Sequence, residues 1–242
     1  MNNIQSPFAM FYVAASAVFK RARGQFGFKV LPLIALLALS GCNTLVDKPS
    51  RPTVYDFGPG PVSAVTPAPT PASTPAITLA PLVLGDIQAN AGLDTPAVLY
   101  RLSYANTQEL RPYAQARWST SPVQLVQQRL REVLGQRRSV LGMNDDVALA
   151  RNQKPLPEPL LLRVELEEFS HVFFSPTESR GLLRLRATVL EHSAQGDKLL
   201  AQRALVLQRS ATTADAAGGT QALAAAVDAA ALEIDQWLAQ IR

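Results

Sequence analysis

The chain has 242 residues, of which 48% are hydrophobic and 17% charged, and it holds 23 Lys and Arg against 19 Asp and Glu. This length and apolar content are sufficient for one globular domain with a sizeable core. The single cysteine excludes a disulfide framework within the chain and a zinc site built from several thiolates.

Residues 1–41 have the layout of a secretory signal peptide. Basic residues from Lys20 to Lys29 precede an apolar run over residues 30–39, and no acidic residue stands before that run. As a helix the run is roughly 15 Å long, about half of the hydrocarbon thickness that a spanning helix must cross. We therefore expect a cleaved signal peptide and not a permanent membrane span.

The signal ends in Leu39-Ser40-Gly41-Cys42, which resembles the lipobox of bacterial lipoproteins. In that motif the cysteine sulfur receives a diacylglyceryl group and the chain is cut just before it, which explains an unpaired thiol at this position. Two or three acyl chains such as palmitate anchor a protein almost irreversibly, because each buried methylene contributes about 0.8 kcal/mol. We predict lipidation at Cys42, the alternative being a chance tetrapeptide. In the bacterial lipoproteins that this pattern resembles, Asp directly after the cysteine usually marks retention in the inner membrane. Asn43 at that position therefore favours the outer membrane.

Removal of the signal peptide changes the charge balance. Residues 1–42 hold four of the 23 basic residues and none of the 19 acidic ones, so the chain after Cys42 carries 19 of each. A neutral domain has no general attraction for phosphate backbones, and its longest basic run is the pair Arg137-Arg138. Nucleic-acid binding is therefore not expected.

The rest of the chain divides by composition. Residues 42–52 form a polar tether, residues 53–57 alternate like a short edge strand, and residues 58–76 contain six prolines, which favours an extended spacer. We expect residues 77–242 to form a single compact α+β domain.

The clearest helix begins at Ser121 and Pro122. Ser121 is placed as the N-cap, Gln124 occupies the capping-box position, and Gly135 marks the end of the helix. The apolar positions recur at helical spacing: Val123, Val126, Leu130, Val133 and Leu134. One face of this helix is expected to lie on a sheet.

A three-stranded meander follows. Apolar residues alternate from Leu160, and the pattern slips at Glu168-Phe169, which predicts a bulge. Turn residues at 175–178 and 193–197 separate the further strands 181–191 and 199–208. The pattern predicts antiparallel strands with one apolar face and one wet face.

A second long helix is expected to begin near Thr220, after Gly218-Gly219, and to end near Ile241. Its predicted buried stripe consists of Leu223, Val227, Ala230, Ile234, Leu238 and Ile241, and its many alanines allow close approach to the sheet. The predicted architecture is two helices on one face of a mostly antiparallel sheet.

Catalytic and metal-binding patterns are absent from the sequence. His171 and His192 lack a second ligand at metal-site spacing, and no G-x-S-x-G, P-loop or G-x-G-x-x-G motif occurs. The acidic residues at 165, 167 and 168 fit the solvated side of a strand. We predict no metal, no cofactor and no enzymatic activity, and expect a protein that binds or positions something.

Residues 97–118 read as a strand, a turn and a strand that carry tyrosines, arginines and one tryptophan, the residue types enriched at binding hot spots. We predict a partner interface that includes Tyr100, Arg101, Tyr113 and Trp118. The alternative is that Tyr100, Tyr104 and Trp118 fill the core beneath the helix that begins at Ser121, with the arginines at its rim. The residues leave both interpretations open.

The order of these features resembles the ABC-type transport auxiliary lipoproteins, the lipoprotein partners of MCE-domain lipid transport systems of the paraquat-inducible type. The resemblance covers nearly all of the chain after Cys42. It rests on the lipobox, Tyr55-x-Phe57, the stretch Leu93 to Arg101, Tyr113, Ala114, Trp118, Pro122, Leu130, Leu134, the strand Leu162 to Phe169, and Trp237-Leu238. The long leader and the long proline spacer depart from the family pattern.

The resemblance implies a non-enzymatic component on the periplasmic side of the outer membrane. It implies partners as well: an MCE-domain protein, ABC transporter subunits and the phospholipid that they pass between membranes. The proline spacer would give the domain reach. Two rival functions are a partner of another envelope assembly, pilotin-like or for lipopolysaccharide assembly, and a lipid-binding carrier. The sequence leaves the oligomeric state open, a homo-oligomer included.

Overall fold

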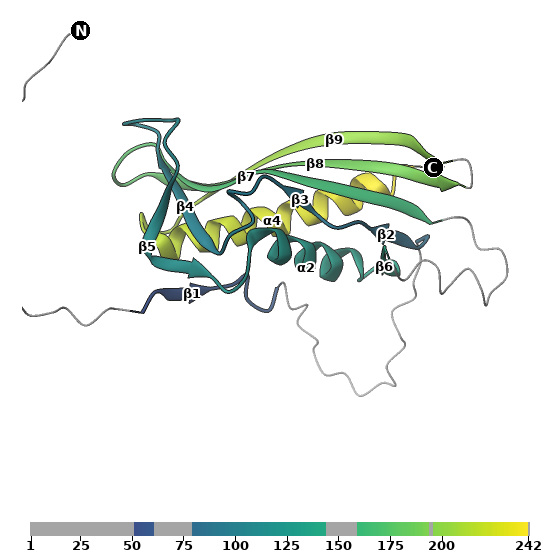
Figure 1. Ribbon diagram of the computed structural model, residues 1–242, viewed down its shortest axis with the longest axis horizontal. Helices are drawn as coiled ribbons and strands as arrows, with labels where there is room; N and C mark the ends of the chain where they lie inside the picture. Colours follow the sequence, from purple (N-terminus) through teal and green to yellow (C-terminus); the bar gives the residue numbers. More distant parts are fainter. Residues whose placement is uncertain (1–50, 61–78, 144–158, 194–195, 242) are drawn as a thin grey trace, which may run out of the picture. The chain divides into compact units, whose positions relative to one another are not determined.

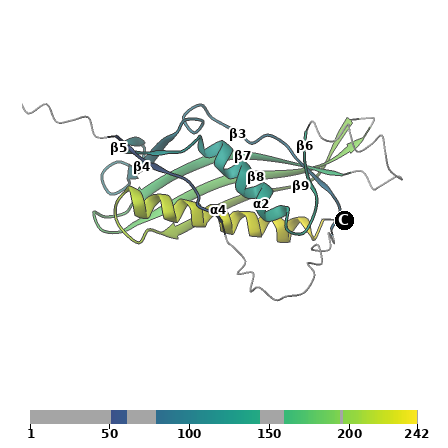
Figure 2. The ribbon, with the colours of Figure 1, turned by 90° about the horizontal axis from the view of Figure 1, so that it is seen from below.

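The computed structural model describes residues 51–60, 79–143, 159–193 and 196–241. Within these ranges, nine strands pair into one sheet, and two helices cover one of its faces (Figures 1 and 2). The predicted α+β class and the placement of both helices on one face are confirmed. The sheet is mixed: its three longest strands pair antiparallel, whereas several short strands pair parallel.

The predicted meander forms the largest part of the sheet. Its strands are β7 (Leu160–Phe173), β8 (Ser179–Ser193) and β9 (Gly196–Ser210), and both pairings are antiparallel. The register between β7 and β8 shifts between Leu166 and Glu168, which is the bulge that the broken alternation predicted.

The other edge of β7 is lined by short strands in chain order. These are β2 (Leu82–Leu84), β3 (Gln88–Ala89) and β4 (Ala97–Leu102), and each pairs parallel with β7. A further short strand, β6 (Val140–Gly142), pairs with β2. Strands of two or three residues have no measurable period, so the sequence pattern could not indicate them.

The predicted strand, turn and strand over residues 97–118 are β4 and β5 (Arg111–Trp118), which pair antiparallel. Beyond β5 lies β1 (Thr53–Tyr55), which pairs parallel with residues 116–118 at the edge of the sheet. The predicted edge strand is therefore present. Because β1 belongs to the sheet, the spacer at 58–76 connects two parts of one fold in the sequence and does not separate the fold from the tether.

The first helix, α2, spans Pro122–Leu134 with Ser121 at its N-cap and Gly135 at its C-cap, as predicted. The predicted capping box is wrong, because the Ser121 side chain makes no cap hydrogen bond. The second helix, α4, spans Ala216–Leu238 and starts earlier than predicted. The Asp215 carboxylate accepts the Gly218 N–H at 2.9 Å, so both glycines of the pair 218–219 lie inside the first turn.

The glycines permit α4 to lie directly on the sheet (Figure 2). A Cβ atom at Gly219 would lie 2.3 Å from Nδ1 of His171, and one at Gly181 of β8 would lie 2.6 Å from the backbone N of Leu223. No side chain larger than hydrogen fits at either place without movement of its neighbour. The alanines along the same helix face are fully buried, including Ala226 and Ala230.

The core fills the space between the helices and the sheet. Its large buried side chains include Leu82, Leu84, Trp118, Leu130, Leu134, Leu162, Leu166, Phe169, Leu183, Leu185 and Leu223. On the opposite face of the sheet, Arg163, Arg184 and Gln202 are exposed. The meander thus has the apolar and wet faces that its alternation predicted.

Candidate functional site

Three of the four predicted interface residues lie together at one end of the sheet. The rings of Tyr100 on β4 and Tyr113 on β5 lie 4.6 Å apart between centroids, and both are half-buried. Phe173 of β7 lies 6.1 Å from Tyr100, at a near-perpendicular angle. Adjacent strands therefore build one aromatic cluster from residues that are distant in sequence.

His171 is the polar centre of this aromatic cluster. Its Nδ1 lies 2.8 Å from the Tyr113 hydroxyl, and its side chain is completely buried between β7 and Gly219 of α4. Burial lowers the pKa of His171 to about 4, only partly opposed by the negative charge of Asp215. Burial likewise raises the pKa of the Tyr113 phenol above its usual value. At neutral pH both groups are uncharged, so that the pair acts as a structural hydrogen bond.

Arg101 points to the opposite face of β4, because consecutive strand residues alternate. It forms an ion pair with Glu168 at 2.9 Å and donates to the carbonyl oxygens of Thr107 and Gln108, both at 3.4 Å. Arg101 therefore fastens the loop between β4 and β5 to β7.

Trp118 does not belong to a surface. Its side chain is 1% exposed and packs on Phe57 and Phe169, with ring centroids 5.5 Å and 5.6 Å away. The prediction of Trp118 as an interface residue is corrected accordingly, since a side chain so deeply buried offers no area to a partner. The alternative interpretation, a core residue, describes it.

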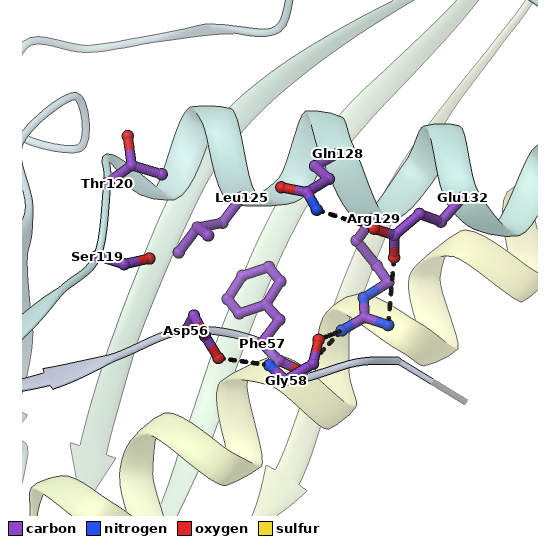
Figure 3. A pocket seen from close by; sticks show the side chains of 9 residues that line it. All are labelled: Asp56, Phe57, Gly58, Ser119, Thr120, Leu125, Gln128, Arg129 and Glu132. Atoms are coloured by element: carbon purple, nitrogen blue, oxygen red, sulfur yellow. Dashed lines mark hydrogen bonds and ion pairs between the residues drawn. The ribbon is translucent and has the colours of Figure 1, made fainter. Parts of the chain in front are cut away.

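A small cavity lies between the N-terminal segment and α2 (Figure 3). It has a volume of about 150 Å³, and its lining consists of Asp56, Phe57, Gly58, Ser119, Thr120, Leu125, Gln128, Arg129 and Glu132. The segment 56–58, which follows β1, faces one side of α2 across the cavity, as Figure 3 shows.

Arg129 dominates this cavity, although the sequence analysis did not single it out. Its side chain is 2% exposed and donates to the carbonyl oxygens of Phe57 at 2.7 Å and Gly58 at 3.0 Å. It also pairs with Asp228 of α4 at 3.3 Å and with Glu132 at 3.5 Å. The guanidinium is occupied by these groups, and thus clamps residues 57–58 to both helices.

A sequence signal for Arg129 existed. It stands three residues after Val126 and one before Leu130, on the apolar side of the helical pattern. A charged residue on that side needs buried partners.

The basic pair Arg137-Arg138 is also engaged within the fold. Asp235 of α4 accepts hydrogen bonds from Arg137 at 2.7 Å and from Arg138 at 3.0 Å. Arg138 and Asp235 are both buried. This contact joins the end of α2 to the end of α4.

Two of the three acidic residues of β7 form ion pairs. Glu167 accepts from Arg186 at 2.7 Å, and Glu168 pairs with Arg101. Within the described ranges, no three His, Cys, Asp or Glu side chains gather as a metal site would require. Neither helix of the described chain is apolar over enough residues to cross a membrane.

The structure does not describe two of the side chains that the sequence analysis names. Cys42 lies outside the described residues, and so does the side chain of His192. Lipidation of Cys42 stays a prediction.

Known proteins give an independent comparison. The family model of the ABC-type transport auxiliary lipoprotein component matches residues 64–235. The match includes α2 and Arg129 but begins after Phe57 and Gly58, the residues that Arg129 holds. No curated protein matches the chain.

Solved structures share the fold. Protein XCC0632 from Xanthomonas campestris is 16% identical with a TM-score of 0.55, over 68% of this chain and 88% of that one. A second crystal structure, of an uncharacterized protein, is 10% identical with a TM-score of 0.51, over 78% of this chain and 99% of that one. Because the family model spans well over half of the chain, the protein belongs to the family of ABC-type transport auxiliary lipoprotein components.

Proposed function

We propose that the protein is an outer-membrane lipoprotein that serves, without catalysis, as the auxiliary component of an ABC and MCE-type phospholipid transport system. The observation that carries this proposal is the family match over residues 64–235, preceded by a lipobox that ends at Cys42. The anchor would hold the domain at the periplasmic face of the membrane. The domain would then bind the MCE-domain protein and the ABC subunits.

The position of β1 supports a domain that is held close to the membrane. Ten residues separate Cys42 from Thr53, the first residue of β1. Fully extended, this tether spans at most roughly 36–40 Å. The proline spacer lies after β1 and adds nothing to this length, which corrects the expectation that it gives the domain reach.

A non-catalytic role is supported by the state of the titratable groups. His171 is buried and neutral, and Glu167 and Glu168 are each committed to an arginine. A general acid or base must instead reach a substrate and have a pKa near the working pH.

The proposed partner interface retains Tyr100, Arg101 and Tyr113. All three are half-buried at one end of the sheet, Tyr100 and Tyr113 on one face and Arg101 on the other, so each keeps part of its surface accessible. Rigid aromatic side chains with a polar tip are frequent contributors to binding energy.

A pull-down of the lipidated full-length protein after crosslinking in cells tests this function. We expect an MCE-domain protein and ABC subunits to be enriched over a Cys42→Ser control. Enrichment of pilus-assembly or lipopolysaccharide-assembly proteins would favour the first rival function. Phospholipid bound to the protein in native mass spectrometry would favour the carrier.

The interface is tested by the variant Tyr100→Ser, which leaves the hydrogen bond between Tyr113 and His171 in place. We expect weaker recovery of the partner with an unchanged circular dichroism spectrum. Full recovery of the partner would remove Tyr100 from the interface.

A further inference from the structure

Exposed apolar side chains gather at the end of the sheet where β4 meets β5 and β7 meets β8. Tyr104 is 51% exposed, Leu110 36% and Phe174 44%. Single exposed apolar residues are ordinary on protein surfaces, whereas several at one end indicate a contact surface. We call the loop 103–110 and the turn 174–178 together the apolar tip.

The two segments of the apolar tip leave the sheet side by side. Leu102 pairs with Phe173 in the ladder between β4 and β7, and Ser103 N–H donates to the Phe173 carbonyl oxygen at 2.9 Å. The three exposed side chains therefore come from segments that are distant in sequence but adjacent in the fold (Figure 1).

Both segments of the apolar tip are ordered by internal contacts. Arg101 binds the loop carbonyls of Thr107 and Gln108. In the turn, the Ser175 hydroxyl accepts the Glu178 N–H at 2.9 Å, and the Arg180 guanidinium lies 5.3 Å from the Phe174 ring centroid. A preorganised surface loses little conformational entropy when it binds.

The first described strand begins towards this same end of the sheet. β1 runs parallel to β5, with Thr53 beside Ala116. Thr53 therefore lies nearer to the start of β5 than Tyr55 does, and the start of β5 follows the loop of the apolar tip. In Figure 1, β1 begins at the end of the sheet that carries the loops after β4 and β7.

We propose that the apolar tip contacts the surface of the phospholipid bilayer to which Cys42 tethers the chain. This inference rests on the proposed acylation of Cys42, because a tether of ten residues would keep Thr53 within roughly 36–40 Å of the membrane. A weak contact suffices in that case, since tethering makes the second binding event intramolecular.

The chemistry of the apolar tip fits a bilayer interface. Tyr104 has a ring and a polar hydroxyl, and such side chains are enriched at the headgroup level, while Leu110 and Phe174 can enter the acyl boundary. The charges at the tip are balanced: Arg111 pairs with Glu109 at 2.6 Å and Arg180 with Glu178 at 3.2 Å. Apolar contact is therefore expected to outweigh attraction to anionic lipids.

A fluorescent probe at the apolar tip tests the contact in the lipidated full-length protein. Cys42 is the only cysteine, so after its acylation an introduced cysteine is the only thiol open to labelling. The tip label is placed at Gln108→Cys, which is exposed in the loop. The matched control label is Lys198→Cys, whose side chain is 73% exposed near the turn between β8 and β9, at the other end of the sheet.

Both labelled proteins are reconstituted into vesicles of phosphatidylethanolamine and phosphatidylglycerol. We expect the probe at 108 to shift to the blue and to be quenched severalfold by spin-labelled lipids, and the probe at 198 to remain in an aqueous environment. Changing Tyr104, Leu110 and Phe174 to Ser should abolish the response at 108 without loss of vesicle flotation. Leu232→Ser, an equally exposed position of α4, should leave the response intact.

The outcomes separate this inference from the proposed function. A protein that floats with the vesicles while the probe at 108 stays aqueous refutes the membrane contact and leaves the anchor standing. A response at 108 that appears only after a partner protein is added refutes it as well, in favour of a protein contact. A protein that neither floats nor carries acyl chains refutes both proposals.

Discussion

The two helices cover the same face of the sheet but are held there by opposite means. α2 depends on a charged side chain, because Arg129 is 2% exposed and binds the carbonyl groups of residues 57 and 58. The close packing of α4 on the sheet depends on a residue without a side chain, because Gly219 lies against the buried His171 ring. The contacts of Arg129 on α2 therefore include the N-terminal segment before the family match, whereas Gly219 and His171 both lie within the match.

Removal of the Arg129 guanidinium should have the largest effect. Arg129→Ala leaves two backbone carbonyls and Asp228 without their partner, which we expect to lower the free energy of unfolding by about 3–5 kcal/mol. Urea denaturation measures this loss. Arg131→Ala, at an exposed position of the same helix, is the control and should change stability by less than about 0.5 kcal/mol. Equal effects of the two changes would contradict the clamp.

Acidification tests the buried histidine under α4. The pKa of His171 is about 4 in the folded protein and 6.5 in the reference state, so between these values the unfolded chain binds more protons. Stability should therefore fall as pH decreases from about 6.5 to 4, by up to about 3 kcal/mol. Thermal or urea unfolding over this range measures the loss. His171→Phe should reduce the slope, and an identical slope in both proteins would show that other groups cause it.

Gly219→Ala tests the close approach of α4 to the sheet. Alanine gains about 1 kcal/mol of helix propensity over glycine, but its Cβ would lie 2.3 Å from His171 Nδ1. The free-energy penalty of this overlap should exceed the gain in helix propensity. We therefore expect the free energy of unfolding, measured in urea, to fall by about 1–2 kcal/mol. Ala225→Leu adds volume at an exposed position of α4 and should be close to neutral. A higher stability of the Gly219→Ala protein would contradict this, because it would show that the His171 ring can move aside at no cost in free energy.

The N-caps of the two helices should give the smallest effects. Asp215 accepts the Gly218 N–H, a bond that holds the pKa of its carboxyl below the usual value, so Asp215→Ala should destabilise the fold by about 1 kcal/mol. Ser121 makes no cap hydrogen bond, so Ser121→Ala should change stability by less than about 0.5 kcal/mol. Comparable losses in differential scanning fluorimetry would mean that Ser121 does cap α2.

The sequence predicted those parts of the fold whose pattern is long. The meander and its bulge near Glu168 follow from periodicity over eight or more residues, and the bounds of α2 follow from Ser121, Pro122 and Gly135. The start of α4 was missed because Gly218-Gly219 reads as a helix boundary. Two close approaches explain glycine inside the first turn: Gly218 lies against the Thr213 backbone, and Gly219 lies against the His171 ring.

The contacts within the candidate site could be predicted less well than the fold. Tyr100 and Tyr113 were correctly placed on two successive strands, but nothing in the local pattern indicated that His171 would lie beneath them. Trp118 shows the same limit, because its burial depends on which distant segments cover it. For Arg129 the helical pattern indicates burial, but not the distant partners at residues 57 and 58. The short parallel strands beside β7 likewise depend on tertiary pairing alone.

Metabolic labelling with radioactive palmitate tests the central claim, a lipid-anchored member of the transport auxiliary family, most directly. The account predicts that label enters the wild-type protein and is absent from Cys42→Ser, the change at the only cysteine of the chain. Absence of label from the wild-type protein, or equal labelling of the two proteins, would contradict it.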